Sequence, residues 1–154
     1  QEMLANTQRV FREDGLPIYA MTQAKPFQNR YTLLDAQCFD EFPTWKSALF
    51  SPVEVRKQMF ADSAVRKKLR AEAIEDQSPS VFPRRWDVIF VDHVKLPKNK
   101  IFEHKSVQEM ASAAEKDGLD WFLDISLEED LQTRFVHTNT QGDPQAVCAP
   151  LGGG

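Results

Sequence analysis

Glycine is scarce in this sequence, and its scarcity excludes one class of binding site. Three of the six glycines form the run 152–154, which leaves Gly15, Gly118 and Gly142 for the rest of the 154 residues. Phosphate-cradling loops need several glycines close together, because the backbone must approach the phosphate groups directly. Neither the dinucleotide-binding spacing nor the P-loop spacing occurs, and the Gly-x-Ser-x-Gly pattern of nucleophilic serines is missing too. The sequence therefore excludes a glycine-loop nucleotide site.

Cysteines and long apolar runs are also few. Cys38 and Cys148 are the two cysteines, too few for a disulfide framework or a zinc knuckle. We expect two free thiols, and the alternative is one bridge from the C-terminal tail to the sheet. No segment approaches the run of about 18 apolar residues that a membrane-spanning helix needs. We therefore expect a soluble protein without membrane insertion.

The N-terminus shows no targeting signal. The chain begins at Gln1 without an initiator Met, and no charged-then-apolar segment follows. We expect a processed form or a piece of a larger protein. The sequence indicates no cellular compartment.

The composition is that of one folded domain. Apolar residues make up 42% of the chain and charged residues 27%, close to ordinary globular usage. A chain of this length buries roughly two-thirds of the surface that it would expose when unfolded. We expect one α+β domain over residues 1–141 and a flexible C-terminal tail over 142–154.

Charge is unevenly distributed along the chain, although the net charge is only −4. Basic residues outnumber acidic ones from Arg56 to Lys100, and the balance reverses from Glu103 to Asp130. If these two segments face different ways, the domain should be electrically two-sided.

Alternating apolar residues predict several short strands. The segments with this pattern are 18–22, 29–39, 85–94, 121–125 and 134–140, with a further short strand at 101–105 pairing back on 85–94. Several of them follow one another too closely for crossover helices, which argues against a purely parallel sheet. We expect a mixed or mainly antiparallel sheet of four or five strands, with helices packed on it.

Helical periodicity and capping residues predict the remaining elements. The expected helices are 1–14, 44–49 and a long helix from Ser51 to about Ile74, followed by two that begin at the capping boxes Ser106–Glu109 and Ser126–Glu129. Gly118 is expected to end the first of these two.

One pattern suggests metal-dependent catalysis. Asp92 is followed ten residues later by Glu103-His104-Lys105, which resembles the acid and acid-x-Lys pattern of two-metal nucleases. Such carboxylates could hold Mg²⁺ while Lys105 steadies water or phosphate. An acid-x-Lys triplet is nevertheless expected about 1.5 times by chance in this composition.

Further acidic or histidine ligands would have to come from elsewhere. Glu72 or Glu75 could supply another carboxylate. The three histidines, His93, His104 and His137, would form a metal site with Asp92 or Glu103 only if the fold brought them together, because their spacing is not that of ligands on one helix. No other cofactor is indicated.

Basic and aromatic residues suggest a binding surface instead. The candidate contact residues are Arg66, Lys67, Lys68, Arg70, Phe82, Arg84 and Arg85. Exposed aromatics beside arginine are typical anchors of protein interfaces, and the same surface could contact the phosphates of a nucleic acid. Phe42, Trp45 and Phe50 crowd a nearby segment, and we expect Trp45 and Phe50 to close the core.

Our preferred hypothesis is a non-catalytic interaction domain of a larger protein or assembly. Its contact surface would be the helix from Ser51 and the loop around Phe82, with a protein as partner and a nucleic acid as the second class of partner. The alternative is a Mg²⁺-dependent nuclease that uses Asp92, Glu103 and Lys105.

Overall fold

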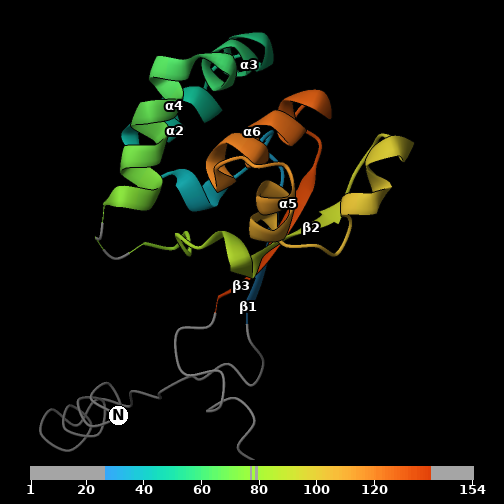
Figure 1. Ribbon diagram of the computed structural model, residues 1–154. Coiled ribbons are helices and arrows are strands. Elements are labelled where there is room, and N and C mark those ends of the chain that lie inside the picture. The colour runs from blue at the N-terminus through green and yellow to red at the C-terminus, as the bar shows by residue number, and fades with distance from the viewer. Residues whose placement is uncertain (1–26, 77, 79, 140–154) are drawn as a thin grey trace, which may run out of the picture.

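The protein folds around a small antiparallel sheet (Figure 1). The computed structural model describes residues 27–76, 78 and 80–139. Its strands are β1 (Phe27–Tyr31), β2 (Ile89–His93) and β3 (Arg134–Asn139), in the order β1-β3-β2. The central strand β3 pairs with both neighbours, so that Phe135 lies opposite Tyr31 on one side and Val91 on the other.

Helices supply the rest of the described fold. The α-helices are α2 (Pro43–Leu49), α3 (Val53–Ala61), α4 (Ser63–Arg70), α5 (Val107–Ala113) and α6 (Gly118–Glu128). The 3-10 turns are η1 (Gln37–Phe39), η3 (Trp86–Val88) and η4 (Pro97–Phe102), and η2 (Ala71–Glu75) is a π-helical continuation of α4. Figure 1 shows α5 and α6 against the sheet, with α2, α3 and α4 stacked beside α6.

Aromatic side chains build the core between these layers. Phe122 of α6 packs against Phe135 of the central strand, with ring centroids 4.3 Å apart. Phe39 of η1 stacks on Trp45 of α2 at 4.0 Å, and the Trp45 indole N–H donates to the Leu69 carbonyl at 3.0 Å. Each of these five residues is buried. The indole hydrogen bond matters because a buried polar group without a partner is costly.

The predicted strand 121–125 is wrong, because these residues lie within α6. Apolar residues occupy nearly every position of this segment, so alternation could not distinguish a strand from a helix buried on several sides. Asp117 caps the helix by accepting from Leu119 N at 2.9 Å. A Cβ on Gly118 would collide with the indole ring of Trp86. Gly118 is thus the first residue of this helix and does not end the preceding one. A glycine is needed at this position because Trp86 packs directly on its backbone.

The prediction of a four- or five-stranded sheet is also wrong, since the sheet that the described residues form has three strands. The segments 29–39 and 85–94 form only the short strands β1 and β2, and the first turns into η1 while the second begins as η3. The predicted strand 101–105 does fold back on β2, but only through the Phe90–Ser106 bridge and hydrogen bonds between Val91 and residues 104 and 105. The predicted strand 134–140 is confirmed over its described residues, which form β3.

The predicted long helix from Ser51 is divided in two. Asp62 breaks it and caps α4 by accepting from Ala64 N and Val65 N, at 2.8 and 2.9 Å. Ser51 does not cap α3, since its hydroxyl donates to Ser47 O instead. The helix expected at 44–49 is confirmed as α2.

The two capping boxes predicted downstream have opposite outcomes. Ser106 caps α5 as expected, accepting from Glu109 N at 3.1 Å. Ser126 is buried inside α6, where its hydroxyl donates to Phe122 O at 2.7 Å. The helix expected at 1–14, the strand at 18–22, the tail at 142–154 and Cys148 lie outside the described residues. Cys38 is a buried free thiol in η1.

Candidate functional site: a hollow beside Phe50

The three residues of the nuclease hypothesis lie near one another in sequence, but they have different partners. The carboxylate of Asp92 pairs with Arg134 on β3 and, at 3.8 Å, with Arg30 on β1. Glu103 accepts a hydrogen bond from Val94 N at 3.1 Å. Lys105 is exposed, and its backbone carbonyl accepts from Val91 N. The structure thus shows each carboxylate neutralised or hydrogen-bonded by groups of the chain itself.

The histidines do not gather around these carboxylates. His93 Nδ1 lies 3.1 Å from Glu103 Oε1, whereas His137 is buried beside the Tyr31 ring, where burial lowers the pKa of its imidazole. His104 lies in an exposed turn with a φ of 67°. Within residues 27–76, 78 and 80–139, no group of three or more His, Cys, Asp or Glu side chains is placed to share a metal ion.

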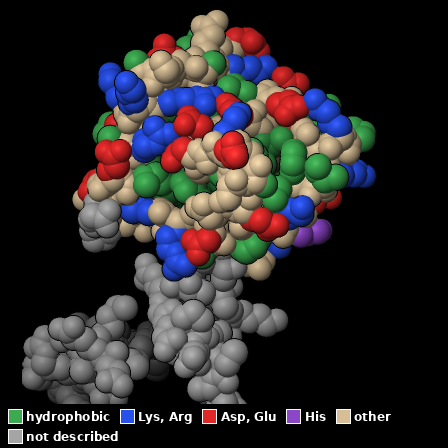
Figure 2. All heavy atoms as spheres, viewed as in Figure 1, with side chains coloured by type: hydrophobic (Ala, Val, Ile, Leu, Met, Phe, Trp, Pro, Cys, Tyr) green, Lys and Arg blue, Asp and Glu red, His purple; other side chains and the backbone are tan. Residues whose placement is uncertain are grey.

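The basic segment and the acidic segment face each other. Arg66 of α4 binds Asp120 and Asp124 of α6, at 3.1 and 2.7 Å. Arg70 binds Asp117 and Asp120, both at 2.8 Å. The condition for two oppositely charged faces, that the two segments face different ways, is therefore not met by α4 and α6. Figure 2 shows basic and acidic side chains interleaved on the visible face.

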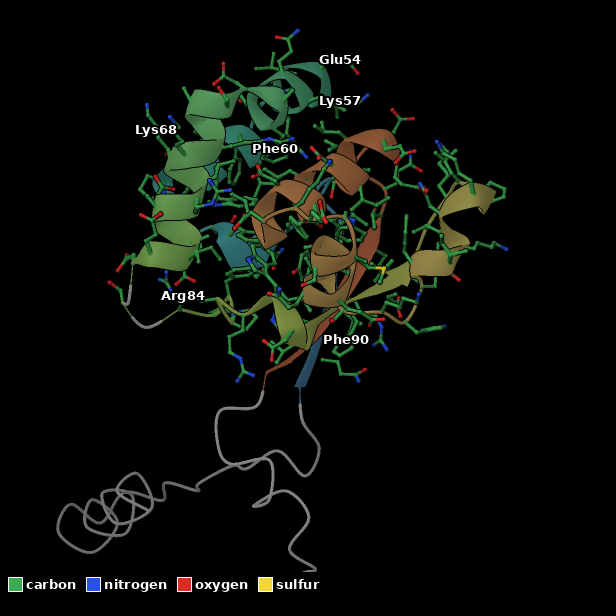
Figure 3. The ribbon with its side chains drawn as sticks, in the orientation of Figure 1. Glu54, Lys57, Phe60, Lys68, Arg84 and Phe90 are labelled. Carbon is green, nitrogen blue, oxygen red and sulfur yellow. The ribbon has the colours of Figure 1, made fainter. Side chains whose placement is uncertain are left out.

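Lys67 and Lys68 are the exposed members of the predicted basic surface on α4. Figure 3 shows Lys68 pointing outward from α4, whereas Phe60 of α3 points inward between the helices. Lys67 and Lys68 have no ion pair within the part of the chain that the structure describes. Of the four cations predicted on this helix, these two are the ones left for a partner.

The aromatic and arginine residues of the following loop serve the fold. Phe82 is buried, with its ring centroid 4.6 Å from that of Phe39. Arg84 lies over the Phe42 ring at 5.1 Å and donates to the carbonyl of Glu72. Arg85 is exposed and pairs with Asp87. The structure thus separates Phe82 from the surface that the sequence suggested.

A hollow of about 320 Å³ opens at another place, between the end of β1 and the end of α2. Phe50 stands beside it with 74% of its surface exposed, and Leu34 is 40% exposed. Apolar side chains that large are usually buried. The residues that line the hollow are Leu34, Asp35, Ala36, Gln37, Asp40, Leu49 and Phe50.

A buried arginine holds the two walls of this hollow together. Arg56 of α3 is only 7% exposed, and burial lowers the pKa of its guanidinium. Its Nη1 donates to Leu33 O and Leu34 O at 2.8 and 2.9 Å, and its Nη2 donates to Leu49 O. Because five donors sit in one rigid plane, a single arginine can fix several carbonyls at once.

The same guanidinium also closes the corner between α2 and α3. Arg56 Nε donates to Ala48 O at 3.3 Å, and Nη2 donates to Ser51 O at 3.1 Å. Phe50 lies between these two acceptor residues in the sequence. It is the C-cap of α2, and its N–H donates to Lys46 O. The backbone on both sides of Phe50 is thus held by hydrogen bonds.

Two unpaired carboxylates stand on the wall of the hollow. Asp35 and Asp40 are exposed, and no hydrogen bond or ion pair to either side chain occurs within the described residues. The other described aspartates all have side-chain partners: Asp62, Asp76, Asp87, Asp92, Asp117, Asp120, Asp124 and Asp130. The aspartates without partners are therefore those beside the hollow.

The expectation that Phe50 closes the core is wrong, because its side chain is 74% exposed. Helical periodicity contained a signal against that expectation. Trp45 and Ala48 lie three residues apart and both are buried, which fixes the inward face of α2. At 100° per residue, Phe50 falls about 140° from Trp45 and therefore outside that face. No comparable signal marks Arg56, because a sequence does not show which arginine will find buried carbonyls.

Comparisons with protein-family models, with curated proteins and with solved structures find no match to this chain. None of the helices in the described ranges is long and apolar enough to cross a lipid bilayer. The function must therefore be argued from the chemistry of the site itself.

Proposed function

We propose that this chain is a non-catalytic interaction domain that binds a segment of another protein at the hollow beside Phe50. The observation that carries the proposal is the exposure of Phe50 next to a hollow that is already formed. Burying a phenylalanine is worth about 1.5–3 kcal/mol. A partner that covers Phe50 gains that free energy without reorganising the domain.

The surrounding surface supports the same reading. Four large apolar side chains are exposed in or beside the two segments that Arg56 joins: Leu34, Phe50, Val53 and Val55. Protein interfaces are commonly anchored by a few aromatic residues that insert into pockets of the partner or frame pockets of their own. A volume of about 320 Å³ lies at the lower end of the range for small-ligand pockets, about 300–1,000 Å³, and suits one or two side chains of a peptide.

This proposal moves the contact surface from the place where the sequence suggested it. Phe82 is buried, and Arg66 and Arg70 are engaged by aspartates of α6. Lys67 and Lys68 stay a predicted contact for a nucleic acid. A titration with a labelled single-stranded oligonucleotide checks that alternative, because binding through these lysines would weaken steeply as salt rises.

The proposal is tested with a random peptide-display library presented to the immobilised domain. We expect enriched peptides whose affinity falls at least tenfold when Phe50→Ser is introduced, because the anchor is lost. Ile101→Ser is the matched control, since Ile101 is 67% exposed in η4, outside the hollow. Urea unfolding should show that both variants keep the stability of the parent.

Two results would overturn the proposed function. One is a library that yields no binder. The other is a set of binders whose affinity is the same for the parent domain and for Phe50→Ser.

A further inference from the structure

We infer that the segment bound at the hollow carries a large apolar side chain next to a lysine or arginine. This inference rests on the proposed function and adds the chemistry of the partner. Its basis is the contrast between the apolar residues that line the hollow and the two acidic residues that stand on its wall.

Asp35 and Asp40 differ from the other described aspartates because their carboxylates have no partner in the chain. Elsewhere in the described residues, aspartates cap helices or pair with arginine and lysine, as Asp62 and Asp120 do. Asp35 and Asp40 do neither. A cation brought by a partner would therefore be the first to pair with them, without displacing a contact that the fold already uses.

The positive groups of the domain itself do not neutralise this wall. Arg56 lies behind the hollow, but its donors are directed at backbone carbonyls and its side chain is buried. Lys46 precedes Phe50 by one helical turn, yet it is not among the lining residues. The charge presented inside the hollow is thus acidic.

The carboxylates of this region also act on the buried thiol of Cys38, although less than burial does. Burial, and then the nearby carboxylates of Asp40 and Glu41, raise its pKa to about 12. Those carboxylates disfavour a second negative charge in this region. An acidic peptide would meet the same repulsion, whereas a basic one would be attracted.

The inference is tested with three peptide-display libraries that share random apolar positions and differ only in fixed flanking residues. The flanks are lysine in the first, glutamine in the second and glutamate in the third. We expect the parent domain to enrich binders chiefly from the lysine library. Their affinity should fall about fivefold for the double variant Asp35→Asn/Asp40→Asn, the effect of losing two exposed ion pairs.

A matched control keeps the net charge of that variant but leaves the hollow intact. The double variant Glu109→Gln/Glu115→Gln removes two exposed carboxylates at α5 and the turn after it. It should bind lysine-flanked peptides as the parent does. Added salt should weaken the binding of lysine-flanked peptides more than that of glutamine-flanked ones, because salt screens interactions between exposed charges.

The outcomes separate this inference from the proposed function. Equal enrichment from the glutamate library, with binding that still depends on Phe50, would overturn the charge preference and leave the interaction domain standing. Binders that are indifferent to Phe50→Ser would overturn both. Binding that responds equally to the two double variants would reduce the effect to net charge and contradict a role for Asp35 and Asp40.

Discussion

At the scale of single residues, Arg56 links the core to the hollow. A buried guanidinium normally needs a carboxylate, since removing a charge from water is costly. Here backbone carbonyls of two segments take that role. One side chain thus fixes both Leu34 and the corner that carries Phe50, and the shape of the hollow depends on it.

Replacing this arginine should therefore destabilise the domain. We expect Arg56→Met to lower the free energy of unfolding by about 3 kcal/mol, because several buried carbonyls lose their donors. Lys57→Met is the control, since Lys57 pairs with Glu54 and Asp130 at the surface and the loss of exposed ion pairs should lower the stability far less. Urea unfolding at neutral pH measures both. Equal stability of the two variants would show that the carbonyls do not depend on Arg56.

Single residues also show how far the sequence could predict the site. The position of Phe50 outside the buried face of α2 follows from helical periodicity alone. The burial of Phe82 does not, because a Val-Phe-Pro tip in a polar loop has the same sequence whether it faces solvent or the core. Its ring neighbours Phe39 and Phe42 come from a distant part of the chain.

At the scale of elements, the strongest charge feature is the set of ion pairs between α4 and α6. Arg66 is held by Phe60 O as well as by Asp120 and Asp124. Burial raises the pKa of the Asp124 carboxyl, but hydrogen bonds from Lys116 and Arg66 outweigh it and leave the pKa below its ordinary value. The arginines of α4 thus help to hold α4 against α6.

This docking predicts a measurable coupling between the two helices. A double-mutant cycle with Arg66→Gln and Asp124→Asn should give an interaction free energy of about 0.5–1 kcal/mol at low ionic strength. The value should shrink in about 1 M NaCl, because the pair is partly exposed and salt screens it. Unfolding curves of the four proteins provide the measurement, and a coupling near zero at low salt would contradict the assignment.

Elements with a single dominant signal were predicted well, and those with two competing signals were not. The alternation in 134–140 indicated only a strand, and the capping box at Ser106 indicated only a helix start. In 121–125, the apolar residues fit both an alternating strand and a helix buried on several sides. The segment is a helix because α6 packs against the sheet and the neighbouring helices. In the long helix from Ser51, the strong capping preference of Asp62 overrode a continuous apolar stripe.

At the scale of the whole molecule, much of the charge of the described fold is paired within the chain. Its basic and acidic segments pair with each other across α4 and α6. The hollow beside Phe50 combines an exposed aromatic ring with unpaired carboxylates. This combination is a property of the assembled fold, because it requires the end of β1 and the end of α2 to meet. Sequence patterns describe each segment separately and could not predict that meeting.

The measurement that tests this account most directly is the location of a bound peptide on the domain. Amide chemical shifts, recorded while a lysine-flanked binder is added, should change mainly at residues 34–40 and 49–50. The amides of Lys67 and Lys68 and of residues 81–85 should stay nearly unchanged. Shifts concentrated at those lysines or in the 81–85 loop, with the hollow unaffected, would contradict the central claim.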